Sequence, residues 1–138
     1  MEKIQVLVDW CGKNYAAYIA DERIKAEAIV VTAKTKDELK LKVQEALDFH
    51  IDGCIEDGDS LPQWAIDRAY ELDIEPRISA LLHDAQYYIT LSALSRATGI
   101  KHAQLSHYAN AVSQPKPAQR ERIVSGIHEI GRACMAFA

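Results

Sequence analysis

Histidine and cysteine are the residue types in this chain whose side chains most often support catalysis or metal binding. None of the five histidines forms an H-x-x-x-H or H-E-x-x-H spacing, and the three cysteines lack the C-x-x-C spacing of zinc and redox sites. This pattern indicates reduced, mostly buried thiols. No G-x-S-x-G, P-loop or G-x-G-x-x-G motif occurs. We therefore expect no catalytic residue, no metal site and no cofactor. The residues concerned are His50, His83, His102, His107, His128, Cys11, Cys54 and Cys134.

Two carboxylates leave one enzymatic alternative open. Asp9 and Glu27 fall in predicted strands and could face each other across neighbouring strands, as the acidic residues of a metal-dependent nuclease do. His50, by contrast, falls on a predicted apolar stripe, where we expect a hydrogen-bonded core histidine.

An acidic run spans residues 45–59. It contains six acidic residues and no Lys or Arg, so it could steer a basic partner. The alternative is a solvated face that only increases solubility. The candidate partner-binding residues are Glu45, Asp48, Asp52, Glu56, Asp57 and Asp59.

The stretch from Thr90 to Pro117 is typical of a helix-turn-helix. Two short predicted helices meet at Gly99, and Ile100 and Leu105 provide apolar contacts across the turn. The second helix, about residues 102–110, would be the recognition helix. Its candidate contacts to base edges are Lys101, His102, Gln104 and Ser106. The candidate contacts to phosphates are Arg96, Lys116, Arg120 and Arg122.

The distribution of charge supports DNA as a partner. The whole chain has a net charge of −4, but residues 1–85 carry 10 Lys and Arg against 18 Asp and Glu. Residues 86–138 carry 6 against 2, a net charge of +4. Only the second part therefore has the positive charge that favours binding to phosphates.

Four strands and one helix are predicted in residues 1–76. Residues 4–9, 15–19 and 26–32 are apolar or β-branched and predict an antiparallel meander. Thr35 and Glu38 form a capping box for a helix that we expect to end near Gly53. Residues 70–75 alternate apolar with acidic side chains, which predicts a fourth strand. We expect one antiparallel sheet with a covering helix.

Four helices are predicted in residues 77–138, over about residues 78–87, 91–97 and 102–110 and from Pro117 onward. Gly126 and Gly131 lower the helix propensity of the last one. Close packing against another helix, either in this chain or in a second subunit, would explain them, and the alternative is a weak terminal helix. No secretory signal and no run of about 18 apolar residues occurs, which predicts a cytoplasmic protein that does not enter membranes.

Both parts together resemble the HicB-type antitoxins that carry a C-terminal helix-turn-helix of the lambda-repressor-like kind. The resemblance rests on T-K-D-E-L-K-L-K-V-Q-E-A-L-D-F-H-I-D-G and Y-I-T-L-S-A-L-S-R-A-T-G-I-K-H-A-Q-L-S-H-Y-A-N. It implies a degenerate ribonuclease-H-like first domain that masks a small basic toxin ribonuclease, and a second domain that dimerises and represses a promoter. Ala111 stands where such motifs commonly have Gly, so either the turn after the recognition helix differs or Asn110 adopts a left-handed conformation.

The expected fold is α+β, with a β-β-β-α-β domain over residues 1–76 and an all-α helix-turn-helix domain over residues 77–138. The expected function is a non-enzymatic, homodimeric, sequence-specific DNA-binding repressor. A pure protein-interaction antitoxin is the second hypothesis, and a nuclease that uses Asp9 is the third.

Overall fold

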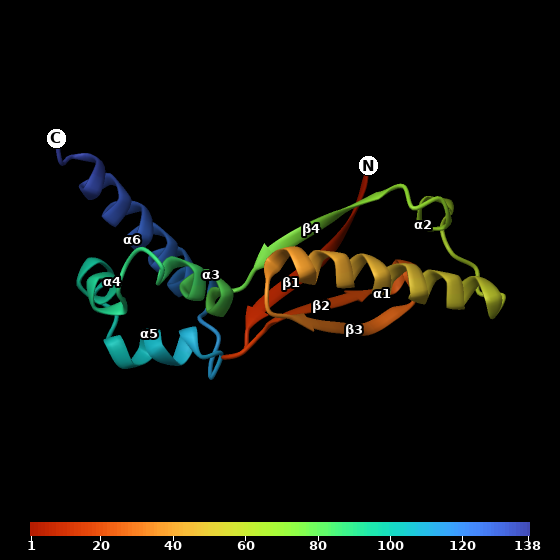
Figure 1. Cartoon of the computed structure of the whole chain (residues 1–138), viewed down its shortest axis with the longest axis horizontal. Helices are drawn as coiled ribbons and strands as arrows, with labels where there is room; N and C mark the ends of the chain where they lie inside the picture. The colour runs from red at the N-terminus through yellow and green to blue at the C-terminus, as the bar shows by residue number, and fades with distance from the viewer. The chain divides into compact units, whose positions relative to one another are not determined.

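The computed structural model describes every residue from Met1 to Ala138 (Figure 1). The chain forms two compact units, Met1–Arg77 and Ile78–Ala138. The first unit contains a four-stranded mixed sheet, and the chain as a whole has six α-helices. The protein is therefore α+β.

The first unit begins with an antiparallel meander. Strand β1 (Glu2–Trp10) pairs with β2 (Tyr15–Asp21), and β2 pairs with β3 (Ala26–Ala33). A short 3-10 helix, η1 (Glu22–Ile24), connects β2 to β3. The three predicted strands and their antiparallel order are confirmed.

Strand β4 (Tyr70–Pro76) corrects the prediction of an antiparallel sheet. The strand order is β3-β2-β1-β4, and β4 runs parallel to β1. Helix α1 (Lys36–Glu56) connects the meander to β4 by crossing back over the sheet, and such a crossover is the usual connection between parallel strands. The direction of β4 therefore follows from the connection, which the alternation of its side chains does not reveal.

Helix α1 begins where the sequence predicts. The hydroxyl oxygen of Thr35 accepts a hydrogen bond of 3.2 Å from the backbone N–H of Glu38. Leu39, Val43 and Leu47 are buried on the side of α1 that faces the sheet. The predicted end at Gly53 is wrong, because α1 continues to Glu56 and also buries Ile51 and Cys54. The four-residue helix α2 (Gln63–Ile66) was too short for its periodicity to be recognised.

The second unit consists of four helices, α3 (Ile78–Ala85), α4 (Leu91–Thr98), α5 (His102–Ala109) and α6 (Pro117–Met135). Their positions match the four predicted helices within a few residues, and a proline opens α6 as expected. Their common core contains Leu82, Leu94, Leu105 and Ile123, all almost completely buried. No helix of the chain is long and apolar enough to cross a membrane.

Gly126 lets α6 approach α4 closely. A Cβ atom at Gly126 would lie 2.4 Å from Cγ2 of Thr98 and 3.3 Å from Cδ1 of Leu94. Gly131 has open space around it instead. The packing explanation therefore applies to Gly126, and its partner is a helix of the same chain.

Candidate nucleic-acid interface

The turn between α4 and α5 is built around Gly99. Gly99 has a φ of 74°, in the left-handed region that glycine adopts without strain, and its N–H donates to the carbonyl of Ser95. Thr90 caps the start of α4, where its hydroxyl accepts from the N–H of Ala93 at 3.0 Å. Both ends of α4 are thus fixed by local hydrogen bonds.

Two side chains brace this turn from inside. The hydroxyl of Thr98 donates to the carbonyl of Leu94 at 2.8 Å and accepts from the N–H of Ile100 at 3.1 Å. Ser95 donates to the carbonyl of Ile100. Ile100 and Leu105 are buried, as the apolar contacts predicted across the turn require. The path from α4 into α5 is therefore held by hydrogen bonds and by burial.

The outer face of α5 carries two of the predicted base-contact residues. Lys101 occupies the N-cap position, and both it and His102 are exposed. Ser106, one turn further along, is half-buried and lies 3.4 Å from the side-chain nitrogen of Asn110. His107 is exposed next to Ser106. Sequence reasoning did not select His107, although its spacing of four residues from Ala103 places both on one side of the helix.

Gln104 has different surroundings. It is half-buried and lines a hollow of about 440 Å³ between α5 and the start of α6. Tyr108, Lys116 and Gln119 line the same hollow. The structure therefore groups Gln104 with Lys116, a predicted phosphate contact, and separates both from the outer face of α5.

The predicted phosphate-contacting arginines occupy three different environments. Arg96 is exposed in the last turn of α4. Arg122 is exposed, and its Nη2 would lie 3.1 Å from a Cβ at Gly99, so the guanidinium lies beside the α4–α5 turn. Arg120 is half-buried, and its Nη1 is shielded from solvent. Arg96 and Arg122 are therefore more accessible to a phosphate than Arg120.

Both expectations for the turn after α5, a different turn or a left-handed Asn110, are wrong. Ala111 itself adopts the left-handed conformation with a φ of 58°, whereas Asn110 has a φ of −94°. The geometry common at this position is kept, and the alanine accepts the unfavourable backbone conformation.

The six predicted partner-binding residues are all exposed, but they do not form one uniform acidic surface. Arg68 lies 2.9 Å from a carboxylate oxygen of Asp48 and 2.6 Å from one of Asp52. Lys25 lies 3.7 Å from Asp59. Four of the carboxylates lie in two separate grooves beside α1. Asp48 lines the groove toward β4, while Glu45, Asp57 and Asp59 line the groove toward β3. Glu56 is exposed and lines neither groove.

A second acidic stripe was not assigned from the sequence. Glu71, Asp73 and Glu75 alternate along β4 and are paired in register with residues of β1. Gln5 donates to the carboxylate of Glu75 at 2.7 Å. The alternation of acidic with apolar residues that predicted the strand was also the signal for this stripe.

The residues considered for catalysis do not assemble. Asp9 lies on β1 and Glu27 on β3, and β2 separates those strands, so the predicted pair is wrong. Arg77 lies 3.5 Å from a carboxylate oxygen of Asp9. No group of three or more His, Cys, Asp or Glu residues is arranged to hold a metal ion.

His50 and Cys54 are close together, but their geometry does not activate the thiol. Nε2 of His50 lies 2.7 Å from the carbonyl oxygen of Ile24, so that nitrogen carries the proton and donates. The same nitrogen lies 3.6 Å from Sγ of Cys54 and therefore cannot accept its proton. Burial and the nearby carboxylates of Asp59 and Asp57 raise the pKa of the Cys54 thiol. His50 is the hydrogen-bonded histidine that was predicted. The prediction of mostly buried thiols is wrong, because Cys11 and Cys134 are exposed and only Cys54 is buried.

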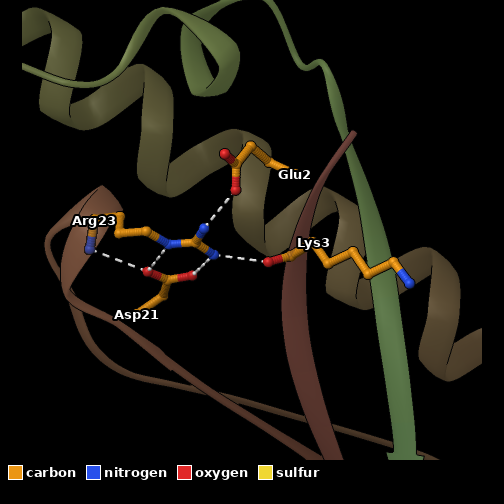
Figure 2. Close-up of polar contacts among 4 residues, drawn as sticks. All are labelled: Glu2, Lys3, Asp21 and Arg23. Carbon is orange, nitrogen blue, oxygen red and sulfur yellow. Dashed lines mark hydrogen bonds and ion pairs between the residues drawn. The ribbon is translucent and has the colours of Figure 1, made fainter.

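Arg23 is the centre of the densest polar cluster in the first unit (Figure 2). Its guanidinium donates to both carboxylate oxygens of Asp21, to the carboxylate of Glu2 at 2.7 Å and to the carbonyl of Lys3 at 2.7 Å. It also lies over the ring of Trp64, 4.9 Å from the ring centre. Since these contacts occupy all three guanidinium nitrogens, we assign Arg23 a structural role.

Comparison of the chain with protein-family models, with curated proteins and with solved structures found no match. The candidate interface therefore depends on the geometry of this chain alone.

Proposed function

We propose that the chain is a DNA-binding transcriptional repressor of the HicB antitoxin type, in which α5 reads the major groove. The observation that carries this proposal is the braced α4–Gly99–α5 turn, which leaves Lys101 and His102 exposed at the start of α5. Side chains at the start of a recognition helix are those that reach base edges. A cytoplasmic location follows from this proposal.

Charge supports the assignment of the second unit to DNA. Ile78–Ala138 carries 6 Lys and Arg against 3 Asp and Glu, whereas Met1–Arg77 carries 10 against 17. Arg96 in α4 and Arg122 in α6 are exposed and would neutralise phosphates. His107 joins Lys101, His102 and Ser106 as a candidate base contact.

The proposal includes a homodimer formed through α6. Its apolar face is buried at Ile123, half-buried at Ile127 and Ile130, and exposed beyond them at Cys134, in the last turn of the helix. These positions continue one helical stripe past the end of the core. The same stripe of a second copy would cover it, and a dimer of helix-turn-helix units would contact two half-sites about one helical turn apart.

The first unit would hold a basic partner, for which a small toxin ribonuclease is the candidate that the HicB resemblance implies. Its net negative charge supports this role, although Arg68 and Lys25 already pair with three of the predicted carboxylates. A pure interaction antitoxin without DNA specificity is the alternative. Co-expression with the product of a neighbouring small gene tests the toxin partner: no rescue from a toxic neighbour, or no such neighbour, leaves only the DNA-binding regulator.

Fluorescence anisotropy with the DNA upstream of the coding region and with a shuffled sequence tests the DNA proposal. We expect His102→Ala to reduce affinity for the upstream DNA by about 1–3 kcal/mol and to change affinity for shuffled DNA much less. Arg122→Ala should weaken binding to both DNAs and reduce the salt dependence by about one counterion.

Gln104→Ala and Arg120→Ala separate the two groups of candidates. Because Gln104 lines the hollow and Arg120 is half-buried, we expect each to affect binding less than His102→Ala and Arg122→Ala, respectively. Equal losses on both DNAs for every variant would contradict the assignment of base contacts. No binding of the wild type to either DNA would contradict the proposed function.

A further inference from the structure

Strand β3 forms one edge of the sheet and has an unusual amount of apolar surface for an edge. It pairs with β2 alone, and its central residues, Ala28–Thr32, contain no charge and no proline. Charges, prolines and bulges are the features that usually protect an edge strand from pairing with another chain. The centre of β3 lacks the first two, and the register irregularity of this strand lies near its start, between Ala26 and Ile29.

The backbone groups at this edge can be placed from one contact. Nζ of Lys42 lies 3.0 Å from the carbonyl oxygen of Thr32, which therefore points away from β2. In an antiparallel ladder every second residue turns both its N–H and its C=O toward the same side. Val30 shares this direction with Thr32, so the backbone groups of both residues face the open edge. The register irregularity between Ala26 and Ile29 excludes Ala28 from this alternation.

Apolar side chains flank the edge on both faces of the sheet. On the face away from α1, Val30 is 60% exposed and stands beside Tyr18, its partner on β2. On the other face, Phe49 of α1 is 84% exposed and lines a groove of about 970 Å³ together with Ile29 and Val31. A strand added to this edge would cover apolar surface on both faces.

The two ends of this edge carry opposite charges. Near the end of β3 and in the first turns of α1 are Lys34, Lys36, Lys40 and Lys42, with only Asp37 and Glu38 as acidic residues. Near the start of β3 is Lys25, which pairs with Asp59 at the far end of α1, where Glu56 and Asp57 also lie. Glu27, near the start of β3, adds to the acidic end. The basic end therefore has a net charge of +2 and the acidic end a net charge of −3. A twofold axis across β3 would place each basic end opposite the acidic end of the partner.

We propose that β3 pairs with β3 of a second copy of this chain, antiparallel about Val30, so that two sheets join into one. This contact needs only the first unit and does not depend on DNA binding. Val30 would face the partner's Val30 across the axis. Lys42 leaves the carbonyl of Thr32 as the new backbone bonds form, and it remains close to Glu38, 3.4 Å away in the free chain.

Engineered disulfides test this register directly. In an antiparallel hydrogen-bonded pair the Cα atoms lie about 5.5 Å apart, a distance that a disulfide can span. The full chain with Cys11→Ser and Cys134→Ser, which removes the two exposed cysteines, is the parent protein. Val30→Cys is the test variant, and Asp73→Cys on the opposite edge strand is the matched control.

Under mild oxidation we expect Val30→Cys to form a reducible covalent dimer at least about tenfold faster than Asp73→Cys, because pairing raises the local thiol concentration. Equal rates for Val30→Cys and Asp73→Cys would overturn the proposal.

Sedimentation of the unmodified chain gives a second measurement. Val30→Lys places charges beside each other at the axis, and its exposed site leaves the fold intact, which circular dichroism checks. We expect a lower average mass than that of the wild type. A contact through α6 would be present in both proteins, so an unchanged mass would argue against pairing through β3.

Discussion

At the scale of single residues, two glycines in α6 have opposite surroundings. We predict that Gly126→Ala destabilises the second unit by about 1–3 kcal/mol, because its new Cβ would overlap the methyl group of Thr98. Gly131→Ala meets open space and should instead stabilise the helix by up to about 1 kcal/mol. Urea denaturation of both variants measures the difference. A loss of stability at both positions, or at neither, would show that the close approach of α6 to α4 is not as described.

The sequence identified unusual residues, but it did not reveal which atoms surround them. Gly126, Gly131 and Ala111 were all recognised as exceptions to local preference. Only the packing of α6 against α4 distinguishes the two glycines, and only the backbone shows that Ala111 rather than Asn110 has a positive φ. Gln104 and Ser106 are only two residues apart in the sequence, but they point to different sides of α5 because side chains at i and i+2 of a helix do not share a face.

At the scale of elements, Arg23 connects β1, the β2–η1 junction and α2. Its hydrogen bonds with Asp21 lower the pKa of that carboxyl group below its ordinary value. The ionised Asp21 therefore contributes stability above the ordinary pKa of an aspartate, and this contribution is lost as the pH falls through the lowered value.

We predict that the free energy of unfolding falls more steeply below about pH 4 in the wild type than in Asp21→Asn, which has no carboxylate to protonate. Urea denaturation at a series of pH values measures both slopes. Arg23→Ala serves as the matched variant, because it removes the cause of the lowered pKa and should also flatten the slope. Identical acid dependence in all three proteins would contradict the role given to this cluster.

Local patterns predicted the elements better than their connections. Apolar alternation, the Thr35 cap and the proline at the start of α6 are local signals, and each predicted element exists. The parallel pairing of β4 depends on where the chain leads after α1 has crossed the sheet. Local sequence patterns do not contain this long-range information. The Asp9 and Glu27 hypothesis failed for the same reason, since the strand order places β2 between them.

At the scale of the whole molecule, an acidic unit with an exposed sheet edge is followed by a basic unit of four helices, in which we propose that α4 and α5 form a helix-turn-helix. Net charge alone would have argued against DNA, and the division of the chain removes that objection. The separate charges predict separate partners, so DNA should contact the second unit only.

Mapping of backbone amide chemical shifts on addition of the upstream DNA tests the central claim most directly. We predict that the largest changes fall between Gly99 and Asn110, with further changes at Arg96 and Arg122 and none beyond the noise in the sheet of the first unit. Changes concentrated in Met1–Arg77, or no changes in α5 at saturating DNA, would contradict the proposal that α5 reads DNA.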